Sequence, residues 1–188
     1  MKIRKQYKFE ASHRVMNCAS TRCSQNIHGH SFIVEVILES GTLDNGDMVM
    51  DFGLLKPTVG KLFDWLDHSI MVWSHDDDVM ALANTINERV VYMPFNTTAE
   101  NLSKMFFMCI SNILSQTEFK NGETDVTVHA VRVHETATGY AECNDSDIQV
   151  TDWKKVNQLD FAHVDPKDAI LRVINEEWRF DNPEVIND

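Results

Sequence analysis

Two runs near the start of the chain alternate apolar and polar residues, the pattern of a strand with one buried face. The first spans residues 7–13, and its apolar face ends with His13. The second spans residues 28–39, and its apolar face begins with His28 and His30. In an antiparallel pair, the end of the first strand lies beside the start of the second. The pattern therefore predicts that three imidazoles converge at one end of a sheet.

Helical spacing follows in three later regions. Apolar residues recur at this spacing in residues 54–66, and a short capped helix is expected within residues 74–87. A capping box at residues 97–100 precedes the most regular stripe, which runs from Leu102 to Leu114. The chain is thus expected to contain two main helices in addition to its strands.

Strand character returns over residues 125–143, after a short extended segment at residues 89–93. The apolar phase changes near Ala130, which indicates a bulge. With a bulge, Glu135 ends an apolar stripe and faces inward, where a carboxylate needs hydrogen-bond donors. With a continuous register, Glu135 is exposed and His134 faces inward, and periodicity alone leaves both alternatives open.

Composition narrows the class of protein. The 188 residues carry a formal charge of −12, which argues against sequence-independent nucleic-acid binding because that depends on Lys and Arg. No apolar stretch is long enough to cross a bilayer, and residues 1–10 lack the apolar block of a signal peptide. We therefore expect a cytoplasmic protein with no membrane partner, one compact domain and a tail. Within the tail, residues 169–178 predict a docking helix before a frayed end.

The convergent histidines indicate a metal site. Three neutral nitrogen ligands suit a catalytic zinc ion, since the open position can take water or a substrate oxygen. A rival structural site would use two cysteines and two histidines, Cys18, Cys23, His28 and His30. Its spacings do not match the usual zinc-finger pattern, and it leaves His13 unused. We therefore expect zinc to bind the three histidines.

Six segments resemble, in order, those of the 6-pyruvoyl-tetrahydropterin synthase family, whose bacterial branch includes 6-carboxy-tetrahydropterin synthase of queuosine biosynthesis. They are FEASH (9–13), HGHSF (28–32) with a cysteine shortly before it, VMDFG (49–53), LDHS (66–69), NTTAENL (96–102) and VRVHETATG (131–139). The resemblance implies an α+β tunnelling fold (T-fold), in which a four-stranded antiparallel sheet with two main helices assembles into an oligomeric barrel. It also implies a homohexamer of two stacked trimers with active sites between subunits. Residues 1–148 would form this domain and residues 149–188 an extension.

The same resemblance implies roles for individual residues. It implies zinc ligands His13, His28 and His30, catalytic residues Cys23, Asp67 and His68, and substrate contacts Glu135, Thr98 and Arg14. Glu135 would anchor the pterin ring through paired N–H groups. Arg22 and Arg132 are further candidates for binding phosphate. The spacing departs from the family at one point, because four residues separate Cys23 from His28 where the bacterial pattern usually has three and the animal pattern five.

The implied activity is that of a zinc-dependent lyase. Its substrate would be 7,8-dihydroneopterin triphosphate, and its products 6-carboxy-5,6,7,8-tetrahydropterin, acetaldehyde and triphosphate. Two alternatives stay open: formation of 6-pyruvoyl-tetrahydropterin, and a non-catalytic zinc protein that only binds pterins. The HGHSF segment and the CSQNIH spacing favour the bacterial branch, but no single residue decides the product.

Overall fold

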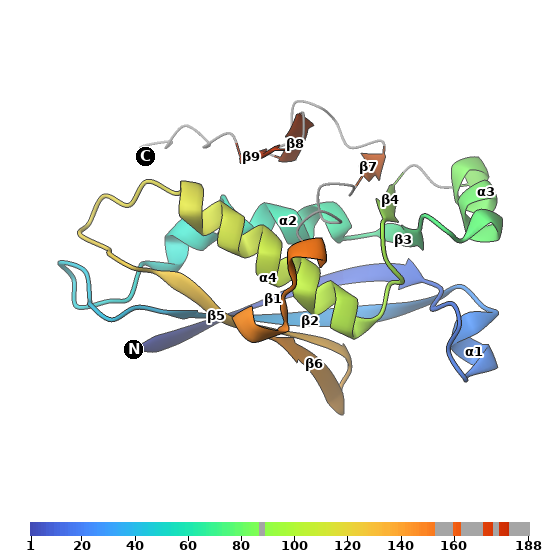
Figure 1. Cartoon of the computed structure of the whole chain (residues 1–188), viewed down its shortest axis with the longest axis horizontal. Helices are drawn as coiled ribbons and strands as arrows, with labels where there is room; N and C mark the ends of the chain where they lie inside the picture. The colour runs from blue at the N-terminus through green and yellow to red at the C-terminus, as the bar shows by residue number, and fades with distance from the viewer. Residues whose placement is uncertain (87–88, 153–159, 163–170, 175–176, 181–188) are drawn as a thin grey trace.

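The computed structural model describes residues 1–86, 89–152, 160–162, 171–174 and 177–180. Its elements are, in chain order, β1 (Lys2–His13), α1 (Thr21–Ser24), β2 (His28–Glu39), the 3₁₀ turn η1 (Phe52–Leu55), α2 (Val59–Leu66), β3 (Ser69–Trp73), α3 (Asp77–Ile86), β4 (Val90–Met93), α4 (Ala99–Gln116), β5 (Thr127–Thr136), β6 (Gly139–Cys143), the 3₁₀ turn η2 (Asp145–Asp147), β7 (Asp160–Ala162), β8 (Leu171–Ile174) and β9 (Glu177–Phe180). Seven of the strands form a sheet in the order β6-β5-β2-β1-β3-β4-β7 (Figure 1). The other two, β8 and β9, pair with each other.

The four-stranded antiparallel unit of the expected fold is present as β6-β5-β2-β1. β1 pairs with β2 along its whole length, from Lys2 opposite Glu39 to His13 opposite His28. This register brings the end of β1 beside the start of β2, as the alternation predicts. Together with α2 and α4, these strands confirm the α+β tunnelling-fold class.

The sheet continues beyond β1 through β3, β4 and β7. β3 runs parallel to β1, β4 runs parallel to β3, and β7 is antiparallel to β4. The pattern of residues 89–93 predicts β4, but no alternation predicts β3. Its first four residues, 69–72, are all buried, so the strand has no polar face to reveal it.

The predicted bulge is confirmed in β5. Ala130 pairs with Ile37 of β2, and the next pair joins Val128 to Leu38. The extra residue, His129, shifts the apolar phase of the strand. β5 then ends, and a short turn returns the chain as β6, so the single run expected here is a hairpin.

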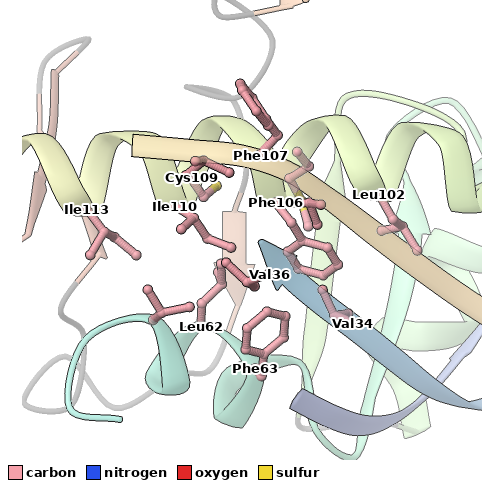
Figure 2. Packing of buried hydrophobic residues seen from close by; sticks show 14 of the residues in the cluster. Val34, Val36, Leu62, Phe63, Leu102, Phe106, Phe107, Cys109, Ile110 and Ile113 are labelled. Carbon is pink, nitrogen blue, oxygen red and sulfur yellow. The ribbon is translucent and has the colours of Figure 1, made fainter. Parts of the chain in front are cut away.

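The hydrophobic core lies between the sheet and helices α2 and α4, which cover one face of it (Figure 1). Figure 2 shows Phe106 of α4 pointing toward Val34 of the sheet and Phe63 of α2. The Phe106 ring centroid lies 5.1 Å from that of Phe63 and 6.0 Å from that of Phe9. The apolar stripe of α4 is therefore part of the hydrophobic core. We call the face of the sheet that packs against this core the inner face, and the opposite face the outer face.

The helix expected over residues 54–66 is instead the turn η1 followed by α2, which begins at Val59. Pro57 explains the break, because it has no N–H to donate and disfavours helical geometry in the residue before it. Asp51 caps η1, and its Oδ1 accepts a hydrogen bond from the Gly53 N–H at 2.7 Å.

The tail differs from its prediction. The docking helix expected over residues 169–178 is absent from the described part of that range, which belongs to β8 and β9. β-branched and aromatic residues such as Val173 and Trp178 favour strands, which accounts for the difference. The expected frayed end, residues 181–188, lies outside the described residues, and the domain boundary near residue 148 stays a prediction. None of the helices in the described part of the chain has the length and hydropathy needed to span a bilayer.

Candidate metal centre and active site

The three histidines predicted to converge do lie together at one end of the sheet. His13 closes β1 and is fully buried, whereas His28 and His30 open β2 and are half-buried. One ring nitrogen of each lies within 4.8 Å of the other two. These three residues are called the histidine cluster below.

Hydrogen bonds set the tautomers of two of these rings. The Nδ1–H of His13 donates to the Thr97 carbonyl at 2.8 Å, and the Nδ1–H of His28 donates to the Asn26 carbonyl at 3.0 Å. Because a carbonyl oxygen only accepts, the proton of each neutral ring is on Nδ1 and the lone pair is on Nε2. Two of the three rings therefore present Nε2 as a metal ligand, with the other nitrogen held by a carbonyl as metal-binding histidines usually are.

Burial favours the neutral, ligating form of these rings. It lowers the pKa of His13 to about 4, which the hydrogen bond to Thr97 opposes and the neighbouring His28 and His30 reinforce. Burial also lowers the pKa of His30, against the opposing charge of Glu135. The Nε2 atom of His13 is buried and has no hydrogen-bond partner among the described residues. Three clustered imidazoles, one with an orphaned buried nitrogen, fit a zinc ion.

The cysteines do not join this cluster. Cys18 and Cys23 are half-buried free thiols, and neither belongs to the group of mutually close metal-ligating atoms found among the described residues. The four-ligand alternative is therefore not supported, because the described residue that completes the group around His28 and His30 is His13 and not a thiol. Cys23 lies in α1, within the segment between β1 and β2 that we call the thiol loop (residues 14–27).

Glu135 faces the histidine cluster. Its Oε1 lies 3.3 Å from His13 Nε2 and 4.0 Å from His30 Nε2, and it is buried without a hydrogen-bond partner. His134 points to the other face of the sheet, where its Nε2 lies 3.9 Å from Glu35. The inward-facing alternative for Glu135 is therefore the one the structure adopts. A carboxylate oxygen and an imidazole lone pair that face each other need a cation or a shared donor between or beside them.

Asp67 and His68 form a hydrogen-bonded pair at the end of α2. His68 Nδ1 donates to Asp67 Oδ2 at 2.8 Å, and Asp67 Oδ1 accepts from the Glu10 N–H at 2.8 Å. Burial alone would raise the pKa of Asp67, but hydrogen bonds from Glu10 and His68 and the charge of Arg89 lower it below its ordinary value. His68 has a positive φ of 58°, so the helix ends there and the two side chains can meet.

The pair opens on the opposite side of the sheet from the histidine cluster. His68 borders a hollow of about 400 Å³ that is lined also by His30 of the histidine cluster and by Glu10, Ser12, Gly29 and Ser31. The last four residues alternate with those of the inner face and are not buried. His68 therefore meets the cluster only at His30, from the outer side of the sheet.

Arg14 is already paired. Its guanidinium makes a two-bond contact with Asp76, including Nε to Oδ2 at 2.6 Å, and lies 3.7 Å from Asp78. Asp76 is buried and also caps α3 by accepting from the Val79 N–H at 3.2 Å. The acidic start of this helix therefore holds an arginine and caps the helix. Arg14 is engaged by a carboxylate at the position where phosphate binding is predicted.

The other predicted phosphate and substrate contacts have partners of their own or lie exposed. Thr98 is the N-cap of α4, where its hydroxyl accepts from the Asn101 N–H at 3.3 Å. Arg132 contacts Glu142 and, at 3.4 Å, Glu35 on the outer side of the sheet. Arg22 is exposed in α1. The structure thus leaves the phosphate-binding roles of these arginines as predictions.

Sequence reasoning missed the residues that hydrogen-bond to the site residues and hold them in position. Thr97 supplies the carbonyl for His13, Asn96 bonds the thiol loop, and Asp76 holds Arg14. Asn96 and Thr97 lie in the NTTAENL segment, which the sequence identifies as a helix start and as one of the six family segments. The capping box expected at residues 97–100 would make Thr97 the N-cap, but Thr98 is the N-cap and Thr97 is buried beside His13.

Comparison with known proteins agrees with this geometry. The sequence profile described as 6-pyruvoyl tetrahydropterin synthase matches residues 2–146. A Helicobacter pylori J99 protein named 6-carboxy-5,6,7,8-tetrahydropterin synthase is 40% identical over 157 residues, covering 83% of this chain and 78% of that protein. A protein of the same name from Aquifex aeolicus is 32% identical over 157 residues, covering 74% and 95%.

Solved structures share the fold at lower identity. An uncharacterized protein from Wolinella succinogenes matches with a TM-score of 0.62 and 20% identity over 77% of this chain and 98% of that one. Caenorhabditis elegans 6-pyruvoyl tetrahydropterin synthase matches with a TM-score of 0.52 and 21% identity over 77% and 94%. With the profile match, the sequence relatives and the shared fold, the chain belongs to the 6-pyruvoyl tetrahydropterin synthase family.

Proposed function

We propose that the chain is a zinc-dependent lyase that converts 7,8-dihydroneopterin triphosphate to 6-carboxy-5,6,7,8-tetrahydropterin, with release of acetaldehyde and triphosphate. The names of the Helicobacter and Aquifex relatives support this product, at 40% and 32% identity. The observation that carries the proposal is the orphaned, buried Nε2 of His13, set among two further imidazoles and a carboxylate. A place in the queuosine precursor pathway is part of the proposal.

His13, His28 and His30 would hold the zinc ion, which supplies a Lewis acid that polarises the substrate's side-chain hydroxyls and makes the adjacent protons easier to remove. Glu135 accepts the paired N–H groups of the pterin ring and fixes its orientation. The buried Oε1 of Glu135 lacks a donor, which supports this role. The inner end of the sheet thus combines a metal site with an anchor for the heterocycle.

Cys23 and the Asp67–His68 pair move protons in the proposed reaction. Cys23 acts as base in its thiolate form. Asp67 remains ionised because its pKa is lowered, and it holds the Nδ1–H of His68 so that Nε2 can take or give a proton. Since His68 opens on the outer side of the sheet, we propose that it serves the site of a neighbouring copy. This supports a homo-oligomer, proposed to be a hexamer of two stacked trimers.

Product analysis tests the function. The purified chain, loaded with zinc, is incubated with 7,8-dihydroneopterin triphosphate, and acetaldehyde and triphosphate are measured together. Equal amounts of both are expected. Triphosphate without acetaldehyde would contradict the carboxy product and indicate the pyruvoyl product instead. Pterin binding with neither product would indicate a non-catalytic pterin-binding protein.

A pair of cysteine variants tests the catalytic thiol. Cys23→Ala should abolish turnover while the zinc content stays that of the wild type, because the thiol is not among the clustered metal-ligating atoms. Cys18→Ala is the matched control, since it removes a half-buried thiol from the same loop. Turnover that survives in Cys23→Ala but not in Cys18→Ala would transfer the proposed role to Cys18.

A further inference from the structure

The thiol loop has little to hold it in place by packing. None of residues 14–27 is buried, and α1 within it is only four residues long. A short surface helix without a buried face gains almost nothing from the core and is marginal by itself. The position of Cys23 relative to the histidine cluster must therefore depend on hydrogen bonds that tie this loop to the body of the protein.

Asn96 supplies two of the bonds that tie the loop to the body, in addition to the Arg14–Asp76 contact, the bond from the Thr97 hydroxyl to the Arg14 carbonyl, and the bond from His28 to the Asn26 carbonyl. The Oδ1 of Asn96 accepts from the Met16 N–H at 3.1 Å, and its Nδ2 donates to the Met16 carbonyl at 2.6 Å. The side-chain amide thus satisfies both backbone groups of one loop residue, as a neighbouring strand would. Beside it, the Val15 N–H donates to the Cys23 carbonyl at 3.0 Å. The backbone of Cys23 is therefore one residue removed from the Asn96 contact.

Asn96 is itself fixed by α4. Its carbonyl accepts from the Thr98 N–H and from Asn101 Nδ2, both at 2.9 Å. Thr98 caps this helix and Asn101 lies in its first turn, so both donors belong to an element that packs in the core. Figure 1 shows α1 and the N-terminal end of α4 at the same end of the sheet. The clamp on the thiol loop therefore begins in the rigid part of the fold.

The next residue performs the same task for the metal site. The Thr97 carbonyl holds the Nδ1–H of His13, and its hydroxyl donates to the Arg14 carbonyl at 3.3 Å. Thr97 is fully buried. Because Asn96 and Thr97 are adjacent, one dipeptide sets both the orientation of a metal ligand and the placement of the thiol loop.

We infer that Asn96 is a positioning residue, which holds the loop carrying Cys23 in register with the histidine cluster through its two-bond clamp on Met16. The inference rests on the proposed function, because it takes Cys23 as the reacting thiol. It also accounts for how a chain with four residues between Cys23 and His28 can place its thiol: the clamp fixes the loop at its start, before α1. The residue touches neither substrate nor metal in this role.

Turnover of Asn96→Ala is the first test. kcat is expected to fall by about 10²-fold, because displacements on the order of 1 Å cost this much. KM for the pterin should change little, since Glu135, the proposed pterin anchor, lies on β5 and not in the thiol loop. Zinc content should stay that of the wild type. Unchanged kcat would overturn the inference. Loss of zinc together with kcat would also overturn it, because Asn96 would then act through the metal ligand.

Alkylation of Cys23 gives a readout that does not require turnover. In a Cys18→Ala background, the rate of reaction with iodoacetamide is measured with and without zinc; Cys109 and Cys143 are buried. A thiol held close to the cluster should react at a rate that depends on zinc, and Asn96→Ala should remove this dependence. The same dependence in both proteins, or none in the parent, would overturn the inference. A parent that makes no acetaldehyde would refute the proposed function, and the alkylation result would still decide the role of Asn96.

Two further variants keep the test decisive. Asn121→Ala is the matched control, because Asn121 Nδ2 also joins two loops, donating to Asp44 Oδ2 at 3.0 Å. These are the loops that follow α4 and β2, and they lie at the opposite end of the sheet from α1 (Figure 1). Asn121→Ala should lower stability without changing the zinc dependence of alkylation, and a change equal to that of Asn96→Ala would overturn the inference. If Asn96→Ala does not fold, Asn96→Asp replaces it. That variant keeps the acceptor for the Met16 N–H and loses the donor, so it should lose part of the zinc dependence, and full retention would count against the clamp.

Discussion

The inner face of the β1–β2 pair has two halves that look alike in pattern and differ in chemistry. In the middle of the sheet, Phe9 and Phe32 stack with ring centroids 4.9 Å apart and are covered by α4. At the end of the same strands, His13 is just as buried, yet its Nε2 has no partner. Alternation places both sets of side chains on one face. Burial alone therefore does not separate core from site, whereas unsatisfied buried atoms that face each other, His13 Nε2 and Glu135 Oε1, mark the site.

The two halves should also differ in energy. Burial of the apolar half stabilises the fold whether or not a ligand is present. The polar half removes His13 Nε2 and Glu135 Oε1 from water without a hydrogen bond from the described residues in return, which costs free energy until a ligand binds. A metal that binds only the folded state would convert this cost into stabilisation. The experiments below separate these contributions, beginning with the largest expected effect.

His13→Ala should break the polar half without breaking the fold. Turnover is expected to fall by about 10³-fold or more, equivalent to roughly 4 kcal/mol, because a metal ligand is lost. Zinc content, measured after dialysis, should fall with it. His129→Ala is the control, since that histidine pairs with Glu39 at 3.2 Å and lies outside the cluster. Zinc retained at full stoichiometry in His13→Ala would contradict the assignment of the metal site.

Phe106→Ala should destabilise the fold and leave the metal site intact. Removal of a fully buried ring that contacts Phe63 and Phe9 is expected to lower the free energy of unfolding by about 3–5 kcal/mol. The measurement is urea denaturation of the metal-free protein. Zinc affinity of the folded fraction should not change, and a parallel loss of affinity would show that the two halves are not independent.

Zinc should stabilise only those variants that keep the histidine cluster. At a free concentration 100 times its Kd, zinc is expected to raise the free energy of unfolding by about 2.7 kcal/mol. Urea denaturation with zinc and with chelator measures the difference. The gain should persist in Phe106→Ala and vanish in His13→Ala. An equal gain in both variants would mean that zinc stabilises the protein somewhere else.

Glu135→Gln should affect pterin binding more than metal binding. The variant keeps the size of the side chain but loses the charge that accepts paired N–H groups, so pterin affinity should fall by about 2 kcal/mol. Fluorescence titration with a non-reacting pterin measures this change, and zinc analysis is its control. Unchanged pterin affinity would remove Glu135 from the substrate site.

Thr98→Ala should have the smallest effect. Loss of the N-cap of α4 is expected to lower stability by about 1 kcal/mol, since the Asn101 N–H loses its acceptor. Thr98→Ser keeps the hydroxyl and should retain most of that stability. A rise in KM that exceeds the stability loss in Thr98→Ala, and that Thr98→Ser reverses, would support the predicted substrate contact in addition to the cap.

Period-two alternation predicted which residues share the inner face, and it did so where one face was polar. It located His13, His28 and His30 correctly, and the phase change near Ala130 indicated the bulge that turns Glu135 inward. It failed for β3, because a strand buried on both faces has no alternation to detect. Helical spacing was wrong in the tail, where it predicted a helix and the described residues form β8 and β9.

No local sequence pattern could predict the tertiary contacts of the site residues. Arg14 is predicted to bind phosphate, but Asp76, 62 residues further along the chain, holds its guanidinium. His68 follows Asp67 as the family motif requires, yet in one copy of the chain it opens on the outer side of the sheet. Both outcomes depend on how distant segments meet, which sequence spacing does not record.

The sequence by itself determined the tunnelling fold, the family and the face on which each histidine lies, because these follow from strand periodicity and from segments in a fixed order. Only the tertiary structure decided which residues hydrogen-bond to the histidines and to the thiol loop. The carbonyl of Thr97 orients His13, and the amide of Asn96 secures the loop of Cys23, although more than 70 residues separate each from its partner. Periodicity reports the direction of a side chain relative to its own strand, whereas a hydrogen-bond partner is supplied by whichever segment the packed core brings within reach.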